Sequence, residues 1–205
     1  MKHAKTSKTW IKEHVNDFYV KQAKKDGYRS RAAYKLLEIV ERNQLLKPGM
    51  TVVDLGAAPG SWSQVVIQNI GRKGKVIALD LLEMAPLQGV DFIRGDFRET
   101  CTLNALEEKL ANCLVGLVLS DMSPNVSGIE ISDQARSIYL AELALAFSIE
   151  RLKLGGNFLV KAFQGRDFDQ LVRSMRTGFQ QVVIRKPKAS RGRSKELYLL
   201  GVGKK

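Results

Sequence analysis

Two charged residues of this chain stand beside or inside apolar segments, where an isolated charge would be costly. Lys161 lies inside the apolar run Phe158–Phe163, and Asp121 directly follows the run Val115–Ser120. A lysine within so apolar a strand must have its charge paired or its pKa lowered. A lysine and a carboxylate in such positions are suited to acid–base chemistry. They are therefore the first candidates for a catalytic role.

Two further charged residues have positions that suit the same chemistry. Lys35 lies in a predicted helix among alanines and leucines, and Glu196 begins the apolar run Glu196–Leu200. Taken singly, Lys35 could equally be a surface lysine of a helix, and Glu196 a charge at the edge of a strand. Their meaning depends on the elements that would bring them together.

A glycine-rich turn after the first predicted strand indicates a cofactor site. The apolar segment that ends in Asp54 and Leu55 is followed by small residues and then by a helical pattern. Gly56 and Gly60 allow a tight turn and a close approach of a ligand to the backbone. The order Asp-x-Gly-x-x-Pro-Gly, with Pro59 before the last glycine, departs from the dinucleotide fingerprint and resembles motif I of class I S-adenosylmethionine-dependent methyltransferases.

Three other residues are candidate contacts of the cofactor. Asp80 ends the second predicted strand, where an acid can accept hydrogen bonds from ribose hydroxyls of either cofactor class. By the same resemblance, Asp96 would contact the adenine amino group and Asp121 would lie beside the cofactor. Asp96 could instead cap the helix that follows it. Trp62 either packs beside the cofactor or anchors the first helix of the predicted domain.

Several reaction classes lack their residues in this sequence. Amino-group methyltransferases typically carry Asn/Asp-Pro-Pro-aromatic after the fourth strand, and this motif is absent. Carbon-5 pyrimidine methyltransferases need a cysteine, typically after proline, whereas Cys101 follows Thr100 and Cys113 follows Asn112. The two cysteines have neither metal-ligand nor disulfide spacing, so we expect no metal and a reducing, cytoplasmic location. An oxidoreductase with a Rossmann fold is the remaining alternative among the enzyme classes.

The charge of the chain indicates a polyanionic partner. The formal net charge is +12 and the pI about 9.8. Residues 1–35 carry ten Lys and Arg against three acids, and a second basic cluster contains no acid. RNA phosphates suit both clusters, anionic membrane suits them less well, and a solvated loop is the alternative for either cluster alone. No apolar run is long enough to cross a membrane. The second cluster consists of Arg185, Lys186, Lys188, Arg191, Arg193 and Lys195.

Strands alternate with helices along most of the chain. This pattern predicts an α/β fold with a doubly wound, mostly parallel seven-stranded sheet, whose last strand is antiparallel because a basic loop, not a helix, precedes it. We expect a basic helical arm over 1–28 and a single domain over 29–205. Ser30 would cap a helix over 31–41 with Tyr34, Leu37 and Val40 inward. The predicted strands are 51–55, 76–80, 90–94, 115–120, 157–163, 180–185 and 196–202, and the other helices 8–26, 60–70, 102–111, 134–152 and 167–177.

The four charged residues also match a known family. In order and local context, Lys35, Asp121, Lys161 and Glu196 resemble the Lys-Asp-Lys-Glu tetrad of FtsJ-type RNA 2′-O-methyltransferases, and the likeness covers nearly the whole chain. The resemblance implies a Rossmann-like fold, S-adenosylmethionine as cofactor, and a uridine ribose in the A-loop of large-subunit ribosomal RNA as substrate. It makes Lys161 the general base, with a pKa lowered by burial and by Lys35. We expect a monomer; an RNA-binding assembly factor without activity, or an enzyme for another RNA, are the alternatives.

Overall fold

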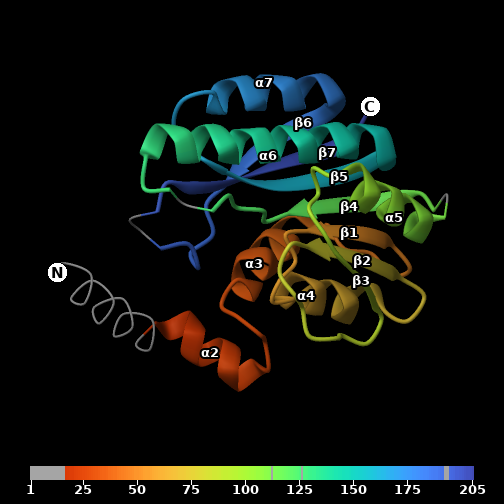
Figure 1. The fold of residues 1–205 in the computed structure, drawn as a ribbon. Coiled ribbons are helices and arrows are strands. Elements are labelled where there is room, and N and C mark those ends of the chain that lie inside the picture. The colour runs from red at the N-terminus through yellow and green to blue at the C-terminus, as the bar shows by residue number, and fades with distance from the viewer. Residues whose placement is uncertain (1–16, 112, 126, 192–193) are drawn as a thin grey trace.

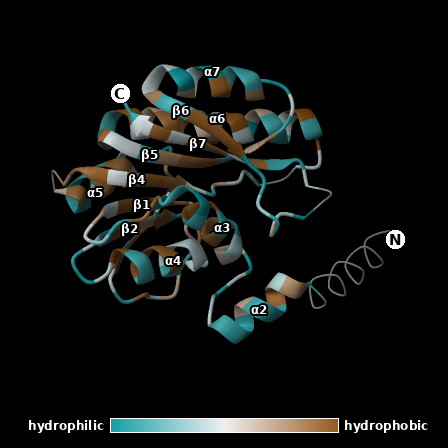
Figure 2. Cartoon of the chain, turned by 180° about the vertical axis from the view of Figure 1, so that it is seen from behind, coloured by the Kyte–Doolittle hydropathy of each residue, from teal (hydrophilic) through white to brown (hydrophobic). Residues whose placement is uncertain are grey.

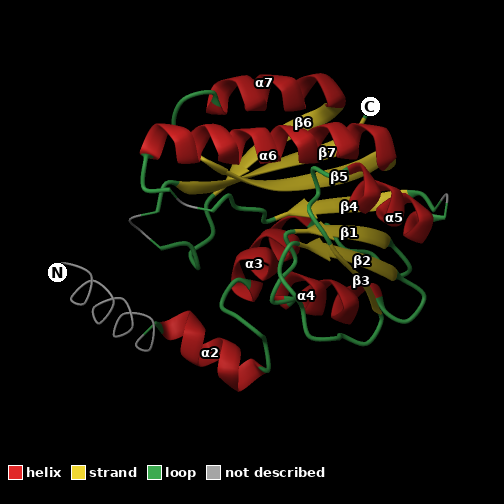
Figure 3. Cartoon of the chain, viewed as in Figure 1, coloured by secondary structure: helices red, strands yellow, loops and turns green. Residues whose placement is uncertain are grey.

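The computed structural model describes residues 17–111, 113–125, 127–191 and 194–205. One seven-stranded sheet runs through the molecule in the order β3-β2-β1-β4-β5-β7-β6 (Figures 1 and 3). All neighbouring pairs from β3 to β5 are parallel, and β7 is antiparallel to both β5 and β6. The predicted sheet, including its antiparallel last strand, is confirmed. The strands are β1 (Thr51–Leu55), β2 (Lys75–Asp80), β3 (Val90–Arg94), β4 (Val115–Ser120), β5 (Leu152–Phe163), β6 (Phe179–Arg185) and β7 (Glu196–Lys204).

The strand order reverses between β1 and β4. From β1 the chain proceeds to β2 and β3 on one side, and then returns to β4 and β5 on the other. In open sheets of this kind, ligands bind beyond the carboxyl ends of the strands at the point of reversal. The turn after β1 and the residue after β4 lie at that point, so the topology places the glycine turn and Asp121 side by side.

Helices cover both faces of the sheet, and each face buries its own apolar cluster. The helices α3 (Ala33–Asn43) and α4 (Ser61–Ile70) pack on one face, and α5 (Thr100–Leu110), α6 (Glu130–Arg151) and α7 (Phe168–Gly178) on the other. Figure 2 shows the strands predominantly hydrophobic and the outer helices with mixed faces. Burial on both faces explains why the central strands are continuous apolar runs rather than alternating ones.

One further helix, α2 (Phe18–Asp26), lies apart from the sheet (Figure 1). Its first turn is capped by Asp17, whose carboxylate accepts from the backbone N–H of Tyr19 and Val20. The helix ends at Asp26, as predicted, and Gly27 follows it in the left-handed conformation. The first part of the predicted 8–26 helix, residues 8–16, falls outside the described residues.

The start and the inward face of α3 differ from the prediction. The helix begins at Ala33, because residues just before it form a turn in which the Ser30 hydroxyl accepts from the backbone N–H of Ala32. Val40 is buried as predicted, but Tyr34 and Leu37 are only partly buried. The same face instead buries Ala33, Leu36 and Ile39.

The helix α6 is also longer than predicted. It begins at Glu130, four residues before the expected start. The sequence did not reveal this first turn because Ile131 is its one apolar residue, so no apolar period is visible there. The carboxylate of Asp133 accepts hydrogen bonds from the backbone N–H of Ser127 and Gly128, which fixes the loop before it. β5 follows α6 directly at Leu152 and is longer than the predicted 157–163 strand. No helix in the described ranges is both long and apolar enough to cross a membrane.

Candidate active site

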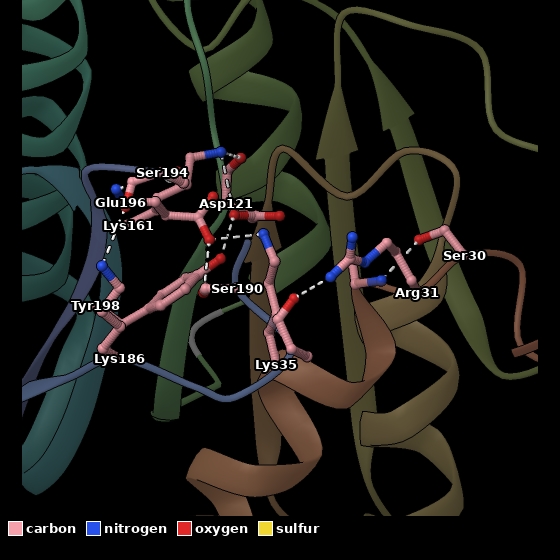
Figure 4. Close-up of polar contacts among 12 residues, drawn as sticks. Ser30, Arg31, Lys35, Asp121, Lys161, Lys186, Ser190, Ser194, Glu196 and Tyr198 are labelled. Carbon is pink, nitrogen blue, oxygen red and sulfur yellow. Dashed lines mark hydrogen bonds and ion pairs between the residues drawn. The ribbon is translucent and has the colours of Figure 1, made fainter. Parts of the chain in front are cut away.

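Three neighbouring strands and one helix bring the four charged residues together. The antiparallel register of β5 and β7 places Lys161 opposite Tyr198, with Glu196 two residues earlier on the same face of β7. Asp121 follows β4, which pairs with β5 up to Val160. Lys35 reaches the group from α3, which covers this face of the sheet. Figure 4 shows the four side chains gathered from these elements.

Two ion pairs hold the four side chains. The Nζ of Lys161 lies 3.1 Å from Oδ1 of Asp121 and donates to the carbonyl oxygen of the same residue at 2.6 Å. The Nζ of Lys35 lies 2.7 Å from Oε1 of Glu196. Lys161 is 7% exposed and Glu196 9%, whereas Lys35 and Asp121 are partly exposed. The expected pairing of the buried lysine is therefore present, and the cluster opens to solvent on the side of Lys35 and Asp121.

Tyr198, which the sequence analysis did not select, connects the two ion pairs. Its hydroxyl donates to Oδ1 of Asp121 at 3.0 Å, and its ring lies 5.8 Å from the ammonium of Lys35. Burial, together with the carboxylates of Asp121 and Glu196, raises the pKa of Tyr198 well above its usual value. The hydroxyl therefore stays protonated and acts as a donor. Its position two residues after Glu196, on one face of the strand, was the signal that could have revealed it.

The loop between β6 and β7 forms a wall of a cavity next to these residues. Ser190 donates to Oε1 of Glu196 at 3.0 Å, and the guanidinium of Arg31 donates to the carbonyl of Ala189 and pairs with Asp17. The cavity has a volume of about 290 Å³. Its lining is rich in cations and hydroxyls, which suits a phosphate-bearing ligand. It is lined by Ser30, Arg31, Ala32, Lys35, Ala189, Arg191, Ser194 and Glu196.

The glycine turn after β1 forms a cradle at the carboxyl edge of the sheet. Gly56 and Gly60 have φ values of +76° and +103°, which L side chains rarely adopt. A Cβ on Gly56 would lie 2.7 Å from the backbone nitrogen of Met122, so the turn also needs glycine for close packing. Asp80, at the end of β2, accepts from the N–H of Ala58 at 2.9 Å and that of Leu82 at 2.8 Å. A backbone cradle with an acid at its side fits a cofactor that carries a ribose.

The other two candidate cofactor residues lie in different environments. Asp96 accepts from the backbone N–H of Arg98 and pairs with its guanidinium at 2.6 Å, which lowers the pKa of the carboxyl. The N-cap position of α5 is occupied by Glu99, so Asp96 does not cap that helix. Trp62 is 3% exposed, and its indole N–H donates to the carbonyl of Ala32. It therefore ties the start of α3 to α4, and its contact with a cofactor stays a prediction.

A buried carboxyl beneath the cradle was also missed. Asp54 in β1 is fully buried, and its Oδ2 accepts from the hydroxyl of Ser63 at 2.7 Å. Its Oδ1 has no hydrogen-bond partner among the described residues. Burial, with smaller contributions from Asp121 and Asp80, raises the pKa of Asp54 to about 7. No group of three or more His, Cys, Asp or Glu suited to a metal occurs in the part of the chain that the structure covers.

The chain is similar to known proteins in sequence and in structure. The sequence profile of the FtsJ-like methyltransferases matches residues 28–204. The chain is 64% identical to ribosomal RNA large subunit methyltransferase E of Nitrosospira multiformis over the full length of both chains. It is 61% identical to the protein of that name from Nitrosomonas europaea, covering 100% of this chain and 99% of the relative. A ribosomal RNA methyltransferase structure from Plasmodium falciparum aligns with a TM-score of 0.77 at 31% identity, covering 86% of this chain and 98% of that one.

Proposed function

The chain belongs to the FtsJ-like methyltransferase family, and from that premise we propose that it methylates the ribose 2′-hydroxyl of a uridine in large-subunit ribosomal RNA. Methyltransferases of this family and fold use S-adenosylmethionine as the methyl donor. The names of the relatives support large-subunit RNA as the substrate. The finer assignment, to the uridine ribose of the A-loop, rests on the resemblance of the four charged residues.

The observation that carries the proposal is the convergence of Lys35, Asp121, Lys161 and Glu196 next to the glycine turn. A 2′-hydroxyl is a weak nucleophile, and its proton must leave as the new bond forms. We assign the acceptor of that proton to Nζ of Lys161 in its neutral amine form, so the ammonium that pairs with Asp121 must first release a proton to solvent. General-base catalysis of this kind contributes roughly 10²–10⁴-fold to a rate. The cofactor, when bound, supplies a methyl group on a positively charged sulfur, and the resulting neutral thioether is a good leaving group.

The remaining members of the cluster hold Lys161 and the ribose in place. Asp121 fixes the amine of Lys161 through its carboxylate and its carbonyl. Lys35 and Glu196 lie at the cavity, where they can hold the ribose hydroxyl or a neighbouring phosphate. Alignment of the attacking oxygen with the methyl carbon supplies the rest of the acceleration. The proposed contacts of the cofactor are Gly56, Pro59, Gly60, Asp80, Asp96 and Asp121, with Trp62 supporting them from the core.

We further propose that the protein acts in the cytoplasm, as a monomer, on the large ribosomal subunit or its RNA. The arm and the basic loop contribute to the net charge of +12, which favours a phosphate backbone as the partner. Two arginines lie at the cavity beside the site: Arg31, which follows the arm, and Arg191 of the basic loop.

The position of the transferred methyl group tests this proposal. The purified protein is incubated with isotopically labelled S-adenosylmethionine and large-subunit RNA that lacks the modification, both free and in assembled subunits. The RNA is then digested to nucleosides. Label in 2′-O-methyluridine is the expected result. Label in a base-methylated nucleoside would overturn the ribose assignment, and RNA binding without any transfer would favour the non-catalytic assembly factor.

A further inference from the structure

Arg29 holds together two loops that border the glycine turn. It lies between α2 and α3, and its Nη1 donates to the carbonyl of Pro59 at 2.9 Å and to that of Ala85 at 2.8 Å. Its Nη2 donates to the carbonyl of Pro86 at 2.8 Å. Pro59 belongs to the turn after β1, whereas Ala85 and Pro86 belong to the loop after β2. One guanidinium therefore joins both sides of the cradle.

The backbone around Arg29 is itself fixed to the helix that follows the glycine turn. Gln64 of α4 accepts from the backbone N–H of Arg29 at 2.8 Å, and its amide donates to the carbonyl of Gly27 at 3.0 Å. The hydroxyls of Ser30 and Ser61 are hydrogen-bonded to each other at 2.7 Å. The backbone of Arg29 is therefore fixed to α4, and from there its side chain is hydrogen-bonded to both loops.

The guanidinium also packs directly against the last glycine of the turn. A Cβ on Gly60 would lie 2.6 Å from Nη1 of Arg29 and 2.9 Å from the sulfur of Met84, in the loop after β2. No carboxylate in the described ranges forms an ion pair with Arg29, so its hydrogen bonds go to backbone carbonyls. These three carbonyls would lose a charged donor together if the side chain were removed.

We infer that Arg29 is a positioning residue for the cofactor, which sets the spacing of the two loops of the cradle. The inference rests on the proposed function only in taking this cradle as the S-adenosylmethionine site. A planar guanidinium donates in two fixed directions, whereas an ammonium is a single centre. Lysine should therefore replace arginine here only in part.

Binding of S-adenosylhomocysteine, the demethylated product, tests the inference without the reaction. Isothermal titration should give Arg29→Ala a Kd about tenfold above that of the wild type, since hydrogen bonds to a charged group are lost. Arg29→Lys should lie between the two. Arg72→Ala, in the exposed turn before β2 at the opposite edge of the sheet, is the matched control and should bind as the wild type.

Steady-state kinetics separate positioning from a general loss of structure. For Arg29→Ala, KM for S-adenosylmethionine should rise while KM for RNA and kcat at saturating cofactor stay within about twofold of the wild type. Equal Kd values for Arg29→Ala and the wild type would overturn the inference, as would parallel changes in every parameter. Should Arg29→Ala fail to fold, Arg29→Gln, which keeps most of the packing, must show the raised Kd. A wild type that does not bind the product at all would instead count against the proposed function.

Discussion

At the scale of single residues, the site balances two cations against two carboxylates, and Tyr198 connects them. Removal of either carboxylate would leave a lysine without its partner in a largely buried place, which costs more than the pair contributes. Tyr198 adds a contact to each ion pair, because its hydroxyl donates to Asp121 and its ring lies beneath the ammonium of Lys35. We therefore expect the proposed reaction to depend on this hydrogen-bonded network as well as on Lys161.

Asp54 should make the stability of the fold depend on pH. Because burial raises its pKa to about 7, the folded state favours the protonated carboxyl. The contribution of this group to stability is fully present below the unfolded pKa near 3.8 and is lost as the pH rises through about 7. Asp54→Asn cannot ionise, so its free energy of unfolding relative to the wild type should increase by about 2–3 kcal/mol between pH 5 and pH 8. Denaturant unfolding at both pH values measures this, and a constant difference would contradict it.

Gly60 should tolerate alanine poorly because of what surrounds it. Its φ of +103° and the close approach of Arg29 and Met84 both oppose a Cβ. We expect Gly60→Ala to weaken binding of S-adenosylhomocysteine by about tenfold or more. Gly71→Ala is the control, because Gly71 also has a positive φ but no atom within 4 Å of the added Cβ. Equal affinities of the two variants would show that the contact with Arg29 has no effect on the cradle.

Among the structural elements, the loop between β6 and β7 is hydrogen-bonded to the rest of the domain, and one of its arginines lines the cavity. The N–H of Lys188 donates to Glu38 of α3 at 2.8 Å, and Ser190 donates to Glu196. Arg191 lines the cavity, and Arg193 lies outside the described residues. This anchoring distinguishes the segment from an unattached solvated loop.

The loop should contribute phosphate contacts to RNA binding. Arg191→Ala should reduce the slope of log affinity against log salt by about 0.7–0.9, the value for one lost phosphate contact, and Arg191→Ala with Arg193→Ala by up to about twice that. Arg173→Ala, an exposed position on α7, is the charge-matched control. Filter binding over a range of salt concentrations provides the slopes. An unchanged slope in the double variant would identify the loop as a solvated one.

The sequence predicted those strands and helices whose residue pattern lies within one short segment of the chain. Apolar runs located the central strands, because strands buried on both faces need them, whereas the edge strands β3 and β6 are only partly buried. The start of α3 was misplaced because the hydroxyl of Ser30 serves a turn and Ser61 rather than the helix end. Tyr198 escaped notice because its role depends on the register that sets it opposite Lys161, which is a non-local property.

Across the molecule, one edge of the sheet carries most of the residues of the proposed site, to which α3 adds Lys35. The cradle follows β1, Asp80 ends β2, Asp121 follows β4, and Lys161 lies near the end of β5. The antiparallel β7 brings Glu196 to the same edge because it begins where β5 ends. The pattern of strands could predict this edge, but the pairing of the tetrad into two ion pairs required the three-dimensional structure.

The assignment of Lys161 as the proton acceptor is tested most directly by the Lys161→Ala variant. Its rate of methyl transfer to large-subunit RNA is measured at saturating S-adenosylmethionine, and its affinity for S-adenosylhomocysteine is measured alongside. Lys153→Ala, at an exposed position of the same strand, is the control. We predict that Lys161→Ala loses about 10²-fold or more in methyl-transfer rate, while its Kd for S-adenosylhomocysteine stays within about twofold of the wild type. A Lys161→Ala protein that transfers methyl groups at nearly the wild-type rate would contradict it.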